Sequence, residues 1–222
     1  MKSIEFQNVS KSFKNKHRVL SELTFSTIAC NNYFLFSNTG HGKSTILNIL
    51  LKDLKPCAGI VKVCNEDIFK FNKRDTRIYR SQLGIIWQSL FLIDQKTVFE
   101  NIAMPLTLGG GKVNISTVDN ILKYAQLYGV KGLFPYNLTL AQRQMVAIAR
   151  ALVTQPKIIL ADEPMNHLDF ESENLAFSLI QKYKHPSATL LFATSQKYLI
   201  EKFARNKEDH ILIVENGKIL GV

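Results

Sequence analysis

Residues 37–45 read S-N-T-G-H-G-K-S-T, which matches the pattern G-x-x-x-x-G-K-[ST] except that Ser37 stands at the first glycine. This pattern needs a strand before it and a helix after it. Tyr33–Phe36 is a short apolar run typical of a buried strand, and Ser44–Leu51 has helical character. A helix that starts at such a loop offers its dipole and free N–H groups to phosphates. The segment therefore predicts an α/β fold around a phosphate site.

A second segment, Lys157–Pro164, reads K-I-I-L-A-D-E-P. It is a short apolar run that ends in two carboxylates, as expected of a buried strand that delivers them to a site. Asp162 is predicted to lie near a metal, and Glu163 near the attacking water. Together the two segments predict a site for a nucleoside triphosphate.

Lys43 is expected to contact the β and γ phosphates, and Ser44 to bind Mg²⁺ through its hydroxyl. A serine in place of the first glycine is expected to cost about 1 kcal/mol if its φ must be positive, which would weaken ATP binding. The alternative interpretation of the whole segment is an ordinary turn. The residues predicted to bind the nucleotide here are Ser37, Asn38, Thr39, Gly40, His41, Gly42, Lys43, Ser44 and Thr45.

The formal net charge is +10, which permits a nucleic-acid or anionic-membrane partner. Because the excess is scattered along the chain, solvated surface lysines are favoured, and no nucleic-acid partner is predicted. The three cysteines lack C-x-x-C spacing and the histidines lack H-x-x-x-H spacing, so reduced thiols and no transition-metal site are predicted. The apolar runs are too short to cross a bilayer, and the first residues lack a signal core, so a cytoplasmic location is expected.

The order of predicted elements is typical of a mixed α/β chain. Residues 89–151 are predicted to be mostly helical, with a flexible turn at Gly109–Gly111. Further helices are expected at Ile115–Tyr128, Ala141–Leu152 and Glu171–Lys184. Strands are expected at Ile4–Val9, Val19–Ile28, Ala58–Val63, Gly84–Trp87, Ile158–Ala161, Thr189–Ala193 and Ile211–Val214.

With three further motifs in order, the chain resembles the nucleotide-binding subunits of ABC transporters over essentially its whole length. Ile85–Ser89 (I-I-W-Q-S) is similar to the glutamine loop of that family, and Leu138–Leu152 to its signature helix. His167–Asp169 (H-L-D) is similar to the loop after the acidic pair. Within the family, Leu92–Leu106 most resembles the cell-division subfamily FtsE, and the lipoprotein-releasing and macrolide-export subfamilies share most of these motifs.

The resemblance implies one ATP-binding domain over residues 1–222. It has a RecA-like P-loop core with a mostly parallel sheet, an N-terminal antiparallel β lobe and a helical insert over about 89–151. It also implies that Asp162 holds Mg²⁺ through water and that Glu163 is catalytic. Gln88 is implied to help hold the metal and to sense a membrane partner, and a surface amide at a strand end is the alternative for it. Phe13 matches the adenine-stacking aromatic, for which a core phenylalanine is the alternative, and Thr139 keeps the signature hydroxyl.

The chain departs from the family at two places. The signature L-S-G-G-Q, which contacts the γ-phosphate bound to the opposite subunit of a dimer, reads L-T-L-A-Q, so Leu140 and Ala141 replace both glycines. Ser195 stands where relatives have a histidine that touches the γ-phosphate. In a homodimer both sites would carry both changes, so the resemblance predicts ATP binding with reduced turnover.

The predicted function is that of an FtsE-like subunit that binds ATP, dimerises on binding it, and drives an FtsX-like integral membrane protein in cell division. Such a subunit lies peripherally on the inner face of the cell membrane. Two further functions stay open: the ATPase of a lipoprotein or small-molecule exporter, and an ATP-binding scaffold that does not hydrolyse.

Overall fold

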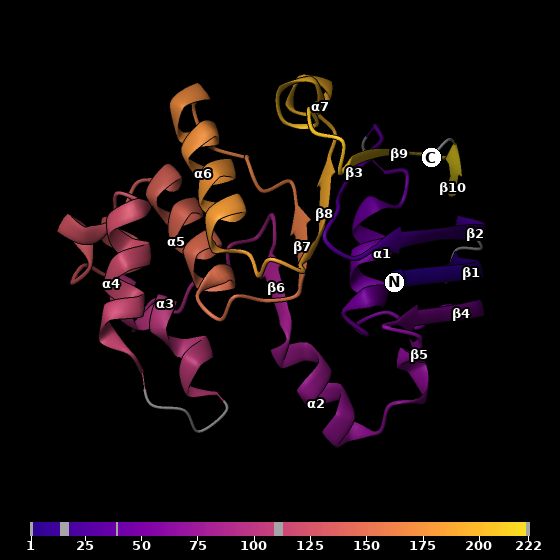
Figure 1. Cartoon of the computed structure of the whole chain (residues 1–222), viewed down its shortest axis with the longest axis horizontal. Coiled ribbons are helices and arrows are strands. Elements are labelled where there is room, and N and C mark those ends of the chain that lie inside the picture. The colour runs from indigo at the N-terminus through magenta and orange to yellow at the C-terminus, as the bar shows by residue number, and fades with distance from the viewer. Residues whose placement is uncertain (1, 14–17, 39, 109–112, 221–222) are drawn as a thin grey trace. The chain divides into compact units, whose positions relative to one another are not determined.

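A computed structural model describes residues 2–13, 18–38, 40–108 and 113–220 (Figure 1). The predicted turn at Gly109–Gly111 and the predicted site residue Thr39 lie outside the described residues. The chain forms two compact units. The first comprises Met1–Arg80 with Ser187–Val222, and the second comprises Ser81–Pro186.

The first unit contains an antiparallel sheet with the strand order β2-β1-β4-β5. These strands are β1 (Lys2–Ser12), β2 (Arg18–Ile28), β4 (Ala58–Val63) and β5 (Glu66–Asp67). Alternating residues of β1 point inward, so Ile4 and Phe6 are fully buried, and the Phe6 ring stacks on Phe25 with centroids 4.8 Å apart. The predicted N-terminal antiparallel lobe is confirmed: β4 has the predicted bounds, β2 begins one residue earlier than predicted, and β1 extends beyond both predicted ends.

The same unit contains a second sheet, in which β3 (Asn32–Phe36) pairs in parallel with β8 (Thr189–Thr194) on one side and β9 (Asp209–Glu215) on the other. The first four residues of β3 are buried, and the apolar run that follows Asn32 is typical of a strand covered on both faces. A short β10 (Lys218–Leu220) continues the sheet antiparallel to β9. Two helices follow these strands: α1 (Lys43–Leu50) after β3 and α7 (Lys197–Phe203) after β8.

All but the last residue of α2 (Lys73–Ser81) belongs to the first unit, where the helix follows a 3₁₀ turn at Ile68–Lys70. The sequence patterns did not predict this helix. Its composition is dominated by Lys and Arg, and Tyr79 is its one buried residue. Its sequence therefore lacks the apolar periodicity that predicts a helix. Polar contacts to the end of α1 fix α2 in place.

The second unit pairs β6 (Leu83–Ile86) in parallel with β7 (Ile158–Asp162). Its helices are α3 (Val98–Thr107), α4 (Ile115–Tyr124), α5 (Leu140–Leu152) and α6 (Phe170–Tyr183), with 3₁₀ turns at Tyr128–Val130 and Pro135–Asn137. The helix predicted over Ile115–Tyr128 ends early, because Gln126 adopts a φ of 58° and the Leu127 N–H donates back to Leu122 O over 2.8 Å.

Within the described part of the chain, none of the helices has the length and apolar character that crossing a bilayer requires. Cys30, Cys57 and Cys64 are free and exposed.

Candidate nucleotide-binding site

Gly42 fixes the path of the phosphate loop from β3 into α1. It is the N-cap of α1 and has a φ of 104°. A Cβ at this position would lie 2.9 Å from Leu20 Cδ2 and 3.2 Å from Val19 O, both on β2. Gly40 also has a positive φ, of 89°, but a Cβ there would meet no atom within 4 Å. The loop therefore needs glycine at position 42 for two reasons, backbone conformation and space, and at position 40 for one.

Lys43, the first residue of α1, turns its side chain back into the loop. Its ammonium donates to Ser37 O over 2.6 Å, to Ser37 Oγ over 3.0 Å and to Asn38 O over 3.4 Å. The residue is only 6% exposed. The structure therefore holds one buried cation against the oxygens of its own loop, and a lysine ammonium is a group that binds phosphate oxygens in proteins.

Ser37 fits its position without the strain predicted from the sequence. It does not occur among the described non-glycine residues with positive φ, so that prediction was wrong. Its side chain is almost fully buried, and its hydroxyl donates to Asn38 O over 2.9 Å while it accepts from Lys43. The serine is thus part of the hydrogen bonding that shapes the loop.

The remaining nucleotide-binding candidates of the first unit line the loop or precede it. Asn38 and Ser44 are exposed, and His41 and Thr45 are half-buried. Phe13, which follows β1, is 45% exposed, which rules out a core phenylalanine. The Lys11 ammonium lies 5.5 Å from the centre of its ring, so the exposed ring keeps a cation beside it.

The acidic pair lies in the second unit, at the end of β7. Asp162 is the last residue of that strand and is 5% exposed, whereas Glu163 is half-buried with a φ of 47°. A glutamate in the left-handed region is uncommon, and surrounding structure must hold it there. Part of that support comes from Gln144 of α5, whose Nε2 donates to Pro164 O over 2.8 Å.

Gln88 follows β6 and is exposed. The segment after it is fixed by Arg150 of α5, whose guanidinium donates to Leu90 O and to Phe91 O, each over 2.7 Å. Burial lowers the pKa of Arg150 from its ordinary value. Arg150 therefore orders the chain directly beyond the predicted glutamine loop.

Gln144 and Arg150 are functional candidates that the sequence motifs did not single out, although both lie within the segment Leu138–Leu152. Nothing in the sequence distinguishes them from the other polar residues of α5, because their partners are backbone carbonyls distant in sequence. Gln144 is fully buried. Through these two side chains, α5 holds both the peptide after Glu163 and the segment after Gln88.

Thr139 begins α5 as its N-cap. Its Oγ1 accepts from the Gln142 N–H over 3.2 Å, and the Gln142 side chain accepts in return from the Thr139 N–H over 3.0 Å. Because Oγ1 acts as the acceptor in this box, its proton is left to donate elsewhere. Leu140 then occupies the first helical position and is 55% exposed, while Ala141 is half-buried.

The two remaining motifs, the loop His167–Asp169 and the position of Ser195, lie in different units. Asp169 is the N-cap of α6 in the second unit, and its carboxylate accepts from the Ser172 N–H over 2.8 Å, which lowers the pKa of that carboxyl. His167, with a φ of 67°, is exposed. Ser195 follows β8 in the first unit and is half-buried. The phosphate loop and Ser195 thus belong to the first unit, and the acidic pair, Gln88 and Thr139 to the second.

The chain is similar to characterised proteins over nearly its whole length. The family model described as "ABC transporter" matches residues 20–166. The cell division ATP-binding protein FtsE of Escherichia coli (strain K12) is 32% identical, over 98% of this chain and 97% of that protein. The methionine import ATP-binding protein MetN 1 of Staphylococcus epidermidis is 31% identical over 98% of this chain, which spans only 64% of that relative.

The solved structures agree with this. A dimeric ATP-binding cassette in a post-hydrolysis state, bound to ADP and Pi, superposes with a TM-score of 0.85 at 26% identity, over 97% of this chain and 96% of that one. A bacterial Atm1-family ABC exporter with ATP bound superposes with a TM-score of 0.84 at 25% identity, over 98% of this chain and 38% of that one. The predicted RecA-like α/β fold is thereby confirmed, and the chain belongs to the ABC transporter family, as an ATP-binding domain.

Proposed function

We propose that this chain is the ATP-binding subunit of a membrane complex and that ATP binding, with slow hydrolysis, drives an integral membrane partner. The observation that carries the proposal is the phosphate loop. It combines a buried, pre-positioned Lys43 with glycines where the backbone requires them. A lysine that is already held by hydrogen bonds loses less conformational entropy when a ligand arrives, which favours affinity.

Each candidate residue has a defined task in this proposal. Lys43 would bind the outer phosphates of ATP, and the exposed ring of Phe13 would stack on the adenine. Glu163 would accept a proton from the attacking water, while Gln144 keeps the peptide beyond it in place. Thr139, through its remaining hydroxyl proton, would donate to the γ-phosphate bound by a second copy of the chain.

The residues proposed for the metal fit Mg²⁺ by their donor chemistry. Ser44 offers an exposed hydroxyl at the start of α1, Asp162 a carboxylate at the end of β7, and Gln88 an amide oxygen. Mg²⁺ prefers such oxygen donors, few of them from the protein and the rest from phosphates and water. Among the described residues no group of three or more His, Cys, Asp or Glu could form a metal cage of its own. When bound, Mg²⁺ would neutralise charge on the phosphates.

For the partner, we infer an FtsX-like membrane protein and a role in cell division. This inference rests on the similarity to FtsE of Escherichia coli over 98% of this chain. The nearly equal identity to a methionine import ATP-binding protein, 31%, supports a second candidate, in which the chain energises the passage of a solute through a permease. An exporter ATPase is a further candidate function, and it differs from the first in its membrane partner. A scaffold that binds ATP without hydrolysing it is another, and measurements of ATP turnover distinguish it from the first.

Two experiments test this function at its two levels. Calorimetric titration with ATP and Mg²⁺ is expected to show binding that Lys43→Ala weakens about tenfold or more, because charge-assisted contacts to phosphate are worth roughly 1.5–3 kcal/mol. Lys218→Ala, an exposed lysine on β10, is the matched control. Equal affinity of the Lys43→Ala variant, with its fold intact, would refute the site.

The partner is tested by depleting the chain in its native host. A division block with unchanged solute uptake is expected from the FtsX-like inference, and it should be accompanied by co-purification of a membrane protein with few transmembrane helices. Loss of uptake of one solute, with normal division, would instead favour the permease candidate.

A further inference from the structure

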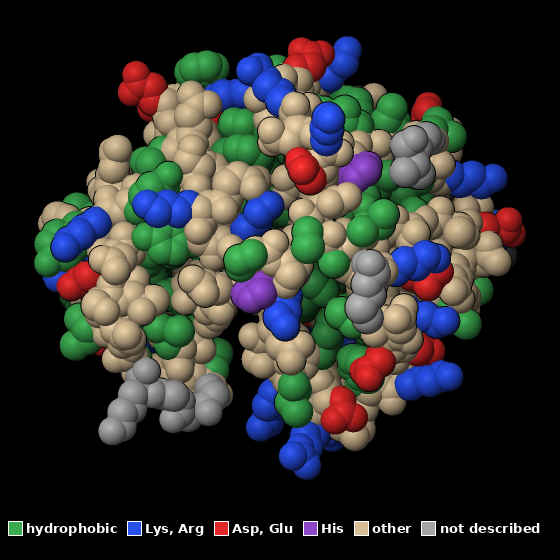
Figure 2. Space-filling model, viewed as in Figure 1, with side chains coloured by type: hydrophobic (Ala, Val, Ile, Leu, Met, Phe, Trp, Pro, Cys, Tyr) green, Lys and Arg blue, Asp and Glu red, His purple; other side chains and the backbone are tan. Residues whose placement is uncertain are grey.

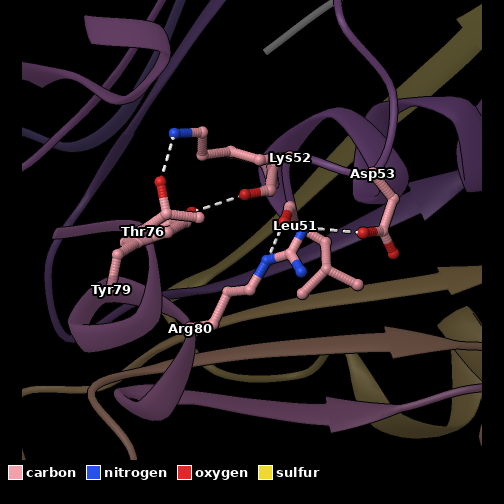
Figure 3. A network of polar contacts seen from close by, with 7 residues as sticks. Leu51, Lys52, Asp53, Thr76, Tyr79 and Arg80 are labelled. Atoms are coloured by element: carbon pink, nitrogen blue, oxygen red, sulfur yellow. Dashed lines mark hydrogen bonds and ion pairs between the residues drawn. The ribbon is translucent and has the colours of Figure 1, made fainter. Parts of the chain in front are cut away.

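The inner face of α2 is fixed to the C-terminal end of α1 by polar contacts (Figure 3). The Tyr79 hydroxyl donates to Leu50 O over 2.7 Å, and burial raises the pKa of this phenol. Arg80 donates through Nε to Leu51 O over 2.9 Å and through Nη2 to Asp53 Oδ1 over 2.7 Å. These donors satisfy the carbonyls that the end of a helix leaves without partners.

Lys52, just after α1, donates hydrogen bonds to α2 and to the segment before it. Its ammonium donates to Thr76 Oγ1 over 2.6 Å (Figure 3). It also donates to Phe71 O over 3.3 Å. Burial first, and the nearby Arg80 guanidinium second, lower the pKa of Lys52. Five hydrogen bonds therefore join α2 and the residues just before it to the end of α1. The outer face of α2 is held in a fixed orientation as a result.

That outer face is cationic. Between residues 70 and 80 the chain carries five Lys or Arg and one acidic residue, Asp75. The nearest other carboxylate in the network, Asp53, is already paired with Arg80. Lys and Arg side chains gather over α2 in the space-filling view (Figure 2). Although the sequence as a whole shows scattered charge, this one segment carries a net charge of +4 out of the total of +10. Arg80 belongs to the inner face and is paired with Asp53, so the other four cations and Asp75 leave a net charge of +3.

The spacing of the outer residues places an apolar side chain among these cations. Arg74, Arg77 and Ile78 are three and four residues apart and so share one side of the helix, with Lys73 next to them. All four are exposed, and Ile78 is 48% exposed. A cationic helix face with an exposed apolar residue is the pattern of a segment that rests on an anionic lipid surface, where the cations meet headgroups and the apolar side chain enters between them.

We propose that the outer face of α2, formed by Lys73, Arg74, Arg77 and Ile78, is a docking surface for the anionic phospholipid headgroups of a bilayer. The charges are complementary, and the inner face of α2 is occupied by α1, so the cations cannot turn inward to find partners there. This contact requires no membrane protein, and it adds a direct attachment to whatever attachment a membrane partner supplies. Its failure would leave the proposed ATP-binding function untouched.

The test is sedimentation of the purified full chain with lipid vesicles, made of phosphatidylcholine alone or with added phosphatidylglycerol. We expect binding only to the anionic vesicles, and loss of binding as salt is raised, because exposed charges are screened. The triple variant Lys73→Gln, Arg74→Gln and Arg77→Gln should bind at least tenfold more weakly, and Ile78→Ser severalfold more weakly. These exposed substitutions leave Thr76, Tyr79 and Arg80 in place, and thermal unfolding verifies the fold.

The matched control is the triple variant Lys197→Gln, Lys207→Gln and Lys218→Gln, which removes the same charge from exposed positions elsewhere in the first unit. It should bind anionic vesicles within about twofold of the unmodified chain. Equal weakening of both triple variants would mean attraction by net charge alone and would overturn the proposal. The absence of vesicle binding at low salt would also overturn the proposal. Binding to duplex DNA that depends on α2, without binding to vesicles, would overturn it as well.

Discussion

The phosphate loop and the start of α5 both correspond to glycine-rich segments in the family, yet the two differ in what their glycines do. In the loop, Gly42 has a φ of 104° and lies against β2, so the fold of this chain itself needs it. At the start of α5, Leu140 and Ala141 stand in an ordinary first helical turn behind a complete capping box. The fold of the subunit does not require glycine there. The difference separates residues that shape the subunit from residues that serve a ligand or partner outside it.

The same distinction explains what can be predicted from the sequence. The β lobe, β3 with its loop, and β7 with Asp162 and Glu163 follow from local patterns, because buried strands are apolar and the motif spacing is fixed. The family-based concern about Ser37 was wrong, because its backbone does not adopt a positive φ. The roles of Gln144 and Arg150 could not be predicted, since their partners are backbone carbonyls distant in sequence. Nor could α2, whose support comes from polar contacts.

The largest effect is expected from Gly42→Ala, which tests whether the fold of the subunit needs glycine at position 42. A positive φ and a clash with Leu20 and Val19 together should lower the free energy of unfolding by about 2–4 kcal/mol and abolish tight ATP binding. Denaturant unfolding and calorimetry measure the two effects. Gly40→Ala is the control, because it shares the positive φ but meets no neighbouring atom. If both variants unfold alike, crowding at position 42 plays no part.

A second test examines the support that α5 gives to the acidic pair. Gln144→Met keeps the volume but removes the amide that donates to Pro164 O. Because the peptide after Glu163 is then less constrained, kcat should fall severalfold to tenfold while KM for ATP stays nearly constant. The free energy of unfolding should change by about 1 kcal/mol or less, since the unpartnered Gln144 Oε1 is removed along with the donor. An increase in KM with unchanged kcat would show that Gln144 does not act through Glu163.

The capping box gives the third test. Thr139→Ala should destabilise the protein by about 1 kcal/mol, whereas Thr139→Ser should retain the cap. If the hydroxyl also donates to phosphate across a dimer, Thr139→Ala should lower ATP turnover further than its effect on stability explains. Thermal unfolding combined with steady-state phosphate release separates the two contributions. Identical turnover of the alanine and serine variants would confine Thr139 to capping.

The fourth test concerns the altered signature itself. Leu140→Gly and Ala141→Gly place glycines in the first turn of α5, and each should destabilise the subunit by only about 0.5–1 kcal/mol. Light scattering with Mg-ATP in a Glu163→Gln background measures the consequence for assembly. We expect the unmodified chain to dimerise weakly and the double-glycine variant more tightly. A tight dimer of the unmodified chain would show that Leu140 is accommodated at the interface.

The most direct test of the central claim is the rate of ATP hydrolysis by the triple variant Leu140→Gly, Ala141→Gly and Ser195→His. Loss of one preorganised donor at a developing charge costs about 10²–10³ in rate, and donors that act as a unit are not additive. We therefore predict that the unmodified chain binds ATP but releases phosphate slowly, and that the triple variant releases it about 10²-fold faster at similar ATP affinity. A triple variant that still binds ATP yet is no faster than the unmodified chain would contradict the account.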